Sequence, residues 1–425
     1  MAATYTYAVR YEAEALCRTP LRTGGTDGDP QSVLRTGDGT ALYQGSSLAG
    51  ALRGWLAAGD ASLAERLFGS QRAAGHLMVS DGVFAPDTES RLRPRLRIDG
   101  ATGSAARGGK FDVAQLDAGS RFRFSLTWLG AERCPEEIQA VEQMLAALDG
   151  GVIRLGAQKS SGFGRVALTV RKSTYDLTDP ADRAAWLRED REGQPLKLPE
   201  ISGAGRVAFT VSGRADSLLV KAGAPLTALD QQGKAFQYTP NLTEGGRPVV
   251  PGSSVKGAVR SRAAMIAELL GLPEAFTEDL FGRMSAQDDN GKPGRVYFED
   301  AALEQVKKAQ ISRIRINRVT GGVIRSALFT EEPLSCGVTL RITAPEEAAG
   351  CGLLLYALRD LGLGLYGLGS GGAVGRGYLA VREIGVTLPD GRTAKLLFDH
   401  ARTCTAEDPH GVLKAWMDAL EEVRS

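Results

Sequence analysis

The chain has 425 residues, of which 43% are hydrophobic and 24% charged, and its formal net charge is +1. These values are ordinary for a globular protein that buries hydrophobic cores, and the length indicates two or three domains. No apolar run is long enough to cross a bilayer, and the N-terminus lacks a secretory signal pattern, so we expect a cytoplasmic protein without membrane partners. The five cysteines show no CxxC spacing, which argues against a zinc site.

In chain order, the first half predicts a strand, a helix, strands, a second helix and a final strand. Alternating β-forming residues, helix-start signals and glycine-rich turns carry these predictions. The expected elements are a strand at 5–15, a loop at 17–44, a helix capped by Ser46 or Ser47 and ending near 58, a strand at 77–84, an exposed arm at 88–110, a strand pair at 111–129, a helix at 136–148, a glycine-rich loop at 156–165 and a strand at 166–171.

The second half repeats this order after a charged segment. We expect a strand at 206–211, a loop at 222–250, a helix at 254–270, a strand at 295–299, a basic arm at 307–327, a strand at 337–343, a helix at 353–361, a glycine-rich loop at 367–377, a strand at 378–387 and a surface helix at 411–423. The order βαββαβ predicts an α+β fold of two ferredoxin-like, RNA-recognition-motif-like domains with long insertions. The expected boundaries are 1–174 and 205–390 for the domains, 175–204 for a charged linker and 391–425 for an acidic tail with a helix.

An internal repeat supports the duplication, because four landmarks return in the same order at nearly constant spacing. The stretch Gly-Ser-Ser-aliphatic-x-Gly-Ala-aliphatic-Arg at 45–53 returns at 252–260. The other landmarks are Leu-Phe-Gly at 67–69 and 280–282, Arg-Ile-Asp/Asn-x-x-Thr-Gly at 97–103 and 315–321, and Gly-Arg at 164–165 and 375–376.

The repeated Gly-Ser-Ser stretch has two interpretations. Free backbone N–H groups and the helix dipole make a helix start suitable for phosphate. Serine at the same place is also a common N-cap, and taken singly the cap is the better interpretation. The candidate phosphate-binding residues in these stretches are Ser46, Ser47 and Arg53 in the first copy and Ser253, Ser254, Lys256 and Arg260 in the second.

The two glycine-rich loops and the two arms are further candidates for binding a polyanion. Glycines permit close backbone approach and Arg grips phosphate, although a tight helix-to-strand turn looks similar. Arginines spaced by two lie on one face of an extended chain, although a solvated edge strand has the same pattern. The candidates are Lys159, Ser160, Ser161, Arg165 and Arg376 in the loops, and Arg91, Arg93, Arg95, Arg97, Arg313, Arg315 and Arg318 in the arms.

With these residues assembled, the chain resembles the RAMP superfamily of CRISPR interference proteins, and more narrowly a tandem fusion of two type III backbone subunits. The two Gly-Ser-Ser stretches, the Leu-Phe-Gly and Thr-Gly segments and the glycine-rich loops carry the resemblance over 5–172 and 205–388. It implies subunits that stack along a guide RNA together with other subunits of a type III effector complex. It also implies that the arms press over the guide and displace a base at intervals.

The resemblance further implies that an Asp in the loop before the Gly-Ser-Ser helix cleaves complementary target RNA with Mg²⁺ or Mn²⁺. Asp27 and Asp29 stand there in the first copy, with Asp29 as the expected metal ligand, and Asp230 lies in the comparable loop of the second. Asp is also a common turn residue. The alternatives are a scaffold without catalysis and a guide-processing endoribonuclease, but the three histidines of the chain are isolated, which weakens the last alternative.

Overall fold

The structure is a computed structural model that describes residues 5–25, 29, 31–99, 102–189, 191–201, 205–229, 232–283 and 291–424. The chain divides into two compact units, and the boundary along the sequence lies between residues 204 and 205. Two short segments, 98–106 and 160–162, group with the second unit. No helix of these residues is long and apolar enough to cross a membrane.

The first unit consists of one main β-sheet, a separate hairpin and the helices between the strands. Its sheet has the strand order β2-β4-β7-β1-β8-β9, with β3 also paired to β7, and β5 and β6 form a separate hairpin. The elements are β1 (Tyr7–Cys17), β2 (Leu42–Tyr43), α1 (Gly45–Gly59), α2 (Ala61–Phe68), β3 (Leu77–Val79), β4 (Gly82–Phe84), β5 (Ser90–Ile98), β6 (Ala105–Leu116), β7 (Arg121–Gly130), α3 (Pro135–Asp149), η2 (Lys159–Ser161), β8 (Val166–Asp176), α4 (Pro180–Arg188) and β9 (Gln194–Pro195).

The second unit repeats the plan with additions. Its main sheet has the order β13-β14-β18-β21-β10-β22-β23-β24, with β17 also paired to β21, and β11-β12-β20-β19 form a smaller sheet. The elements are β10 (Arg206–Leu218), β11 (Leu226–Leu229), β12 (Ala235–Thr239), β13 (Thr243–Glu244), β14 (Arg247–Val250), α5 (Gly252–Leu269), α6 (Glu274–Phe281), β15 (Gly282–Arg283), β16 (Lys292–Pro293), β17 (Tyr297–Phe298), β18 (Ala301–Lys308), β19 (Ile311–Ile316), β20 (Val323–Glu331), β21 (Leu334–Pro345), α7 (Ala348–Gly362), η3 (Gly372–Val374), β22 (Leu379–Thr387), β23 (Thr393–Phe398), β24 (Cys404–Glu407) and α8 (Val412–Arg424).

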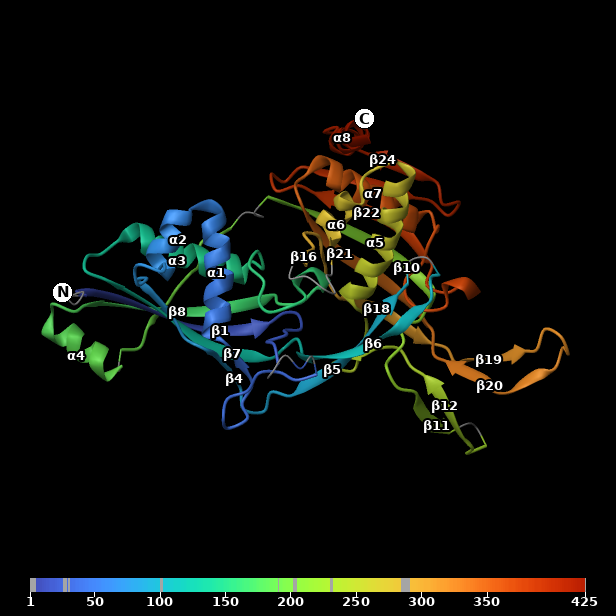
Figure 1. The fold of residues 1–425 in the computed structure, drawn as a ribbon, viewed down its shortest axis with the longest axis horizontal. Helices are drawn as coiled ribbons and strands as arrows, with labels where there is room; N and C mark the ends of the chain where they lie inside the picture. Colours follow the sequence, from blue (N-terminus) through green and yellow to red (C-terminus); the bar gives the residue numbers. More distant parts are fainter. Residues whose placement is uncertain are drawn as a thin grey trace. The chain divides into compact units, whose positions relative to one another are not determined.

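Both main sheets contain the same antiparallel core. The order β4-β7-β1-β8 in the first unit matches β18-β21-β10-β22 in the second. Numbered along each repeat, this is the order 2-3-1-4 of a ferredoxin-like βαββαβ sheet. Within the first unit, helices α1, α2 and α3 lie on one side of β1, β7 and β8 (Figure 1). The prediction of two ferredoxin-like domains is therefore confirmed.

Each unit has its own hydrophobic core between its sheet and its helices. In the first unit, Leu48 and Leu52 of α1 are fully buried together with Tyr11 of β1. In the second, Val255 and Val259 of α5 are buried in the same way. The helical spacing of four between these residues explains the burial, because it places them on one face of each helix. Each buried side chain of this size stabilises the fold by about 2 kcal/mol.

Residues 175–204, expected as a charged linker, carry structure that belongs to the first unit. Strand β9 pairs with β8, and the Trp186 ring of α4 lies 5.2 Å from the Tyr175 ring. Asp182 pairs with Arg191 inside the segment, and Glu189 and Glu192 pair with Arg10 of β1 and Arg171 of β8. The charge content of this segment therefore concealed an element that contacts β8 through Trp186, Asp182 and Arg191.

Residues 391–425, expected as an acidic tail, complete the second unit. Strand β23 pairs with β22, and β24 pairs with β23. Helix α8 buries Leu413, Trp416 and Leu420, and the Trp416 ring lies 5.7 Å from the Phe209 ring. The acidic residues of this segment lie on the outside of elements whose inner positions are apolar.

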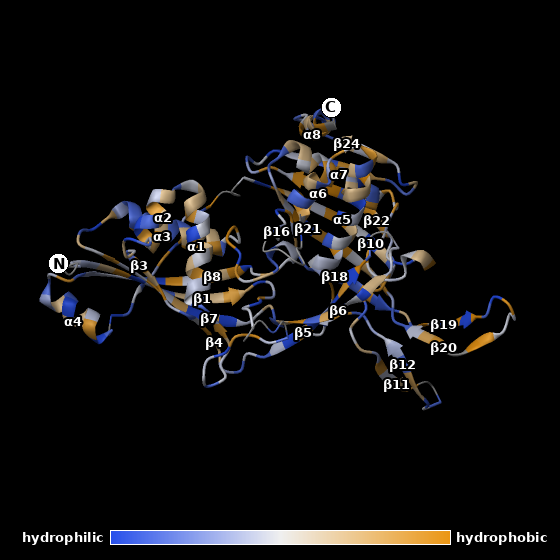
Figure 2. Ribbon diagram, in the orientation of Figure 1, coloured by the Kyte–Doolittle hydropathy of each residue, from blue (hydrophilic) through white to orange (hydrophobic). Residues whose placement is uncertain are grey.

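Two hairpins carry the residues that were expected to form exposed arms. We call β5–β6 the first arm, and β19–β20, extended by β11–β12, the second arm. Figure 2 shows hydrophobic segments on β11 and in the β19–β20 hairpin. The exposed fractions of Leu229, Ile316 and Leu328 are 68%, 58% and 64%. The second arm therefore presents apolar as well as basic side chains.

Candidate nucleic-acid interface

The repeated Gly-Ser-Ser stretch begins a helix in both units, but the serines do not cap it. The N-cap residues are Gln44 before α1 and Pro251 before α5, and neither makes a side-chain cap hydrogen bond. The expected serine caps are therefore corrected, because both helices begin at the glycine that precedes the two serines, at least two residues earlier than expected. Ser46 and Ser47 lie exposed in the first turn of α1.

An aspartate caps each of these helices from a neighbouring loop. The backbone N–H of Gly45 donates to Asp81 Oδ1 at 2.6 Å, and the N–H of Gly252 donates to Asp300 Oδ1 at 2.6 Å. A Cβ on Gly45 would lie 2.7 Å from the Val79 carbonyl oxygen, so only glycine permits this approach. Because a carboxylate already stands at the helix start, a phosphate there would meet a like charge, which leaves the hydroxyl groups as the better binding groups.

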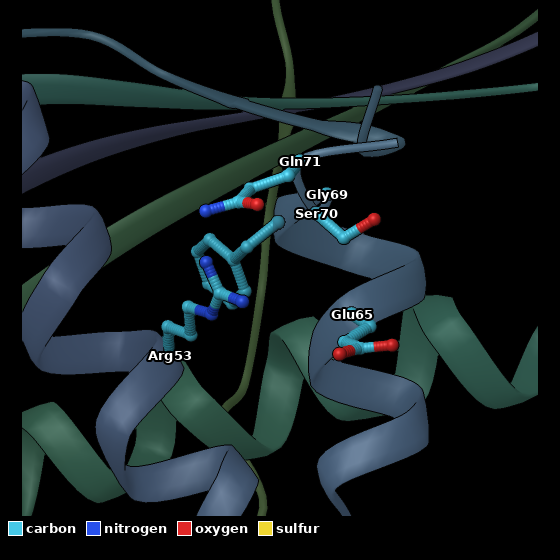
Figure 3. A pocket seen from close by; sticks show the side chains of 6 residues that line it. Arg53, Glu65, Gly69, Ser70 and Gln71 are labelled. Carbon is cyan, nitrogen blue, oxygen red and sulfur yellow. The ribbon is translucent and has the colours of Figure 1, made fainter. Parts of the chain in front are cut away.

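Arg53, the last residue of the repeated stretch, lines an open pocket of about 530 Å³ in the first unit. Figure 3 shows Arg53 on α1, Glu65 on α2, and Gly69, Ser70 and Gln71 in the turn that follows α2. Arg53 is exposed, whereas its repeat partner Arg260 is half-buried. Ser253, Ser254 and Lys256 are half-buried as well. The first helix thus offers its polar groups to solvent more fully than the second.

The two glycine-rich loops correspond residue by residue in the structure, but this alignment differs from the one given by the Gly-Arg pairs in the sequence. The Leu155 N–H donates to the Gly164 carbonyl at 2.9 Å, and the Leu368 N–H donates to the Gly377 carbonyl at 2.8 Å. Both glycines have positive φ, 86° and 77°. Gly164 therefore corresponds to Gly377, an offset of 213 residues, and not to residue 375.

This register changes which residues correspond. Lys159–Ser161 forms a short 3-10 turn in the first glycine-rich loop, and Gly372–Val374 forms the same turn in the second loop. Arg376 corresponds to Phe163, and Arg165 corresponds to Tyr378. The polar residues Lys159, Ser160 and Ser161 consequently have no polar counterparts in the second loop. Burial lowers the pKa of Lys159, which is half-buried.

The first arm is held to the glycine-rich loop of its own unit by stacked arginines. The guanidinium carbons of Arg93 and Arg95 lie 5.1 and 5.3 Å from the centre of the buried Phe163 ring. Arg95 also donates from Nη2 to Gln158 Oε1. Cation–π contacts of this kind stabilise by about 0.5–2 kcal/mol each. Gln158 has φ 61°, a backbone conformation that glycine adopts at the equivalent position of the second loop.

The arginines of the first arm therefore differ in accessibility. Arg91 is paired with Asp117 at 3.0 Å, Arg93 is 4% exposed, and Arg97 is exposed. The four arginines do occupy alternate positions of strand β5, as their spacing in the sequence predicts. Outside the first arm, three more of the candidate arginines reach solvent. Arg165 in the first loop is half-buried, and Arg315 and Arg318 in the second arm are exposed.

The second arm is held by a buried carboxylate. Glu331, which is 3% exposed, accepts from Lys221 Nζ at 2.9 Å and from Arg313 Nη2 and Arg376 Nη1 at 2.5 Å each. Burial raises the pKa of Glu331, but the hydrogen bonds from Lys221, Arg376 and Arg313 outweigh it and lower the pKa to about 2. Arg376 is itself 5% exposed, so its guanidinium is committed to this ion cluster.

The outward face of the first sheet is occupied by internal contacts. Glu14 accepts from Arg121 at 2.7 Å and from Arg123 at 3.1 Å. The Tyr175 ring makes an edge-on contact with the Trp186 ring, and the Arg191 guanidinium lies 4.7 Å from the Tyr175 ring centre. RNA-recognition motifs stack bases on aromatic residues of this face. The loops and arms are therefore better placed than the sheet to contact a nucleic acid.

Among the candidate acids, only Asp29 is described; Asp27 and Asp230 lie outside the described residues. Asp29 is exposed, and its Oδ1 accepts the Gln31 N–H at 2.8 Å in a local turn. No group of three or more His, Cys, Asp or Glu side chains suited to a metal occurs in the part of the chain that the structure covers. Asp29 alone offers one carboxylate to Mg²⁺ or Mn²⁺, so the described residues do not form a complete metal site.

His76 has a structural environment. Its Nδ1 lies 2.8 Å from the buried carboxylate of Glu137, which also accepts from Trp128 Nε1 at 2.7 Å and Arg66 Nε at 3.2 Å. Burial raises the pKa of Glu137, but hydrogen bonds from His76 and Trp128 lower it on balance. This contact ties α3 to the segment that leads into β3, and it gives His76 a structural role.

Four residues that matter for this surface were not among the residues predicted from the sequence. They are Asp81 and Asp300 at the helix starts, and Phe163 and Glu331 at the arms. Asp81 and Asp300 recur between the copies, and that recurrence could have revealed the first pair. Phe163 and Glu331 do not recur, because the two units use different chemistry at these places.

A family model described as the RAMP superfamily matches residues 14–167 and 216–380. The two matched regions correspond to the two units and together span most of the chain. No curated protein matches the sequence.

Proposed function

Because the chain belongs to the RAMP superfamily of CRISPR-associated RNA-binding subunits, we propose that it is a guide-RNA-binding backbone subunit of a type III interference complex. The observation that carries the proposal is the first glycine-rich loop, where Lys159, Ser160 and Ser161 form a turn, and where Gln158 just before that turn accepts a hydrogen bond from Arg95 of the first arm. Backbone N–H groups, hydroxyls and arginines together suit a phosphodiester chain. Other subunits of such a complex would contact the same guide.

The two units are proposed to contribute unequally. The second loop has Gly372–Val374 where the first has Lys159–Ser161, and Arg376 is engaged by Glu331. Arg315 and Arg318 of the second arm are exposed. The second unit would therefore contact RNA mainly through its arm, and the first through its loop and arm together.

We expect the double variant Lys159→Glu and Arg97→Glu to lose copurifying RNA and to bind single-stranded RNA at least about tenfold more weakly. Reversing two charges at the backbone track replaces attraction by repulsion and reduces counterion release, so the salt dependence of binding becomes shallower by about two phosphate contacts. The measurements are the absorbance ratio of the purified protein and binding titrations at several salt concentrations.

Arg123→Glu is the matched control, because Arg123 is 83% exposed in its side chain and lies on the outward sheet face. It changes charge by the same amount per residue and should leave RNA content unchanged. Equal loss of RNA in the control would mean that net charge, and not this surface, determines binding.

We further propose that the first unit cleaves target RNA in the assembled complex, with Asp27 or Asp29 as the acting carboxylate. A bound Mg²⁺ or Mn²⁺ would neutralise charge on the phosphoryl group, and such ions need few protein ligands when they also bind phosphate. The alternative, a scaffold without catalysis, fits the same RNA surface. His76 is engaged by Glu137, which gives no support to a histidine-based guide-processing enzyme.

Separate Asp27→Ala and Asp29→Ala variants test cleavage, assayed in the complex with complementary RNA and Mg²⁺. One variant should lose a single cut by at least about a hundredfold and retain target binding, as expected for loss of a positioned catalytic group. Asp38→Ala is the control, since Asp38 is another exposed turn carboxylate of the same loop region. Wild-type cleavage by both variants would favour the scaffold and direct the test to Asp230.

A further inference from the structure

The end of β1 and the end of β10 occupy equivalent places. The Gly164 N–H donates to the Pro20 carbonyl at 2.9 Å, and the Gly377 N–H donates to the Ser217 carbonyl at 2.8 Å. These hydrogen bonds join each glycine-rich loop to the strand exit of its own unit. They give a residue-by-residue match that does not depend on similarity of side chains.

The same match extends to the second strand of each arm. Leu21, which follows Pro20, pairs with Leu116 in the first unit. Leu218, which follows Ser217, pairs with Leu334 in the second. Three residues before Leu334 stands Glu331, and three residues before Leu116 stands Val113. The ion pair of the second unit therefore occupies the places of two buried apolar residues of the first, because Arg376 corresponds to Phe163.

All four residues at these two places are buried. Val113 and Phe163 are 1% and 0% exposed, and Glu331 and Arg376 are 3% and 5% exposed. The first unit thus has two buried apolar residues at these places, and Arg93 and Arg95 of the arm stack on one of them, Phe163. The second has a charged pair, which the arm's Arg313 joins.

The partners of Glu331 come from three separate parts of the second unit. Lys221 follows β10, Arg313 is in β19 of the arm, and Arg376 is in the glycine-rich loop. Glu331 is the last residue of β20, the strand that leads out of the arm. A single carboxylate consequently connects the base of the arm to the sheet and to the loop.

We infer that Glu331 is a positioning residue that fixes the second arm to its own unit, and that its ion cluster replaces the stacking on Phe163 that fixes the first arm. Removing the carboxylate leaves Lys221, Arg313 and Arg376 facing one another, and Arg376 becomes a buried cation without compensation. Removing one partner of a buried ion pair is far more disruptive than replacing both partners by well-packed apolar residues. The attachment of the arm does not depend on RNA; only its consequence for guide binding rests on the proposed function.

The test measures amide hydrogen exchange of β19 and β20 in the full-length protein without RNA. Glu331→Val should accelerate exchange there by at least about a hundredfold, the factor expected when one partner of a buried ion pair is lost. Exchange in β5 of the first arm is the internal control and should not change. Unchanged exchange of β19 and β20 in Glu331→Val would overturn the inference.

The double variant Glu331→Val with Arg376→Phe transfers the first unit's residues to the second. It should restore exchange of β19 and β20 to within about tenfold of the wild type, since an apolar pair can substitute for a buried ion pair. If Glu331→Val also loosens β10 and β21, recovery of those strands together with the arm in the double variant supports the inference. A double variant that exchanges as fast as the single variant would overturn it. Unchanged RNA binding by a Glu331→Val protein whose arm exchanges fast would instead count against the part that the proposed function gives to the second arm.

Discussion

Gly377→Ala should destabilise the second unit by about 4 kcal/mol or more and leave the first unit folded. Gly377 has φ 77°, and an added Cβ would collide with the carbonyl oxygen of Leu368, the residue whose N–H donates to the Gly377 carbonyl. The left-handed backbone costs an L-residue about 1–2 kcal/mol, and displacing a buried carbonyl adds several more. Gly164→Ala should do the same to the first unit, where the Leu155 carbonyl stands in the way.

Gly375→Ala separates the two causes. Gly375 has φ 82°, but nothing lies within 4 Å of the position its Cβ would take. It should therefore cost only the backbone strain, about 1–2 kcal/mol. Urea unfolding followed by a probe in each unit, such as Trp128 and Trp416, gives the comparison. Equal losses for residues 375 and 377 would show that the carbonyl approach is relaxed in solution.

The second unit should lose about 3 kcal/mol of stability between pH 5 and pH 2 through Glu331 alone. The pKa of this carboxyl is lowered from 4.5 to about 2. A lowered pKa in the folded state means that the contribution is complete above the unfolded pKa and disappears as the pH falls through the folded one. Each pH unit corresponds to about 1.4 kcal/mol, which gives the expected total.

Glu331→Gln provides the reference for this titration, because glutamine keeps the shape and cannot lose a proton in this range. The variant should be less stable than the wild type at pH 7, and the difference should shrink steadily as the pH approaches 2. The pKa of Glu137 in the first unit is lowered as well, so the difference between the two proteins is the quantity to measure. A difference independent of pH would mean that the charge of Glu331 contributes nothing.

The fold could be predicted from the sequence because its signals are local. Alternation marked the strands, and the repeat of helix, strands and helix identified two ferredoxin-like domains. The register of the glycine-rich loops could not be predicted, since glycine and arginine are both frequent there and a match by letters is ambiguous by two residues. Only the hydrogen bonds of Gly164 and Gly377 settle which residues correspond.

The arginine patterns show that the sequence does not predict which arginines are accessible at the surface. A spacing of two places Arg91, Arg93, Arg95 and Arg97 on one face of a strand, but burial depends on what packs against that face. Arg376 is separated from Glu331 by 45 residues, and no local pattern connects them. An arginine beside a glycine-rich loop consequently looks the same in the sequence whether it meets a phosphate or a buried glutamate.

Strands β23 and β24 have a consequence for how this protein can be dissected. They cover the side of β22 that would otherwise be the open edge of the second sheet. A fragment that stops near residue 390 would expose the backbone N–H and C=O groups of a nine-residue strand, and would also uncover the apolar surface beneath Trp416. Open edges of this length pair with other chains and lead to aggregation. A recombinant second unit therefore needs to extend from β10 through α8 to be well behaved in solution.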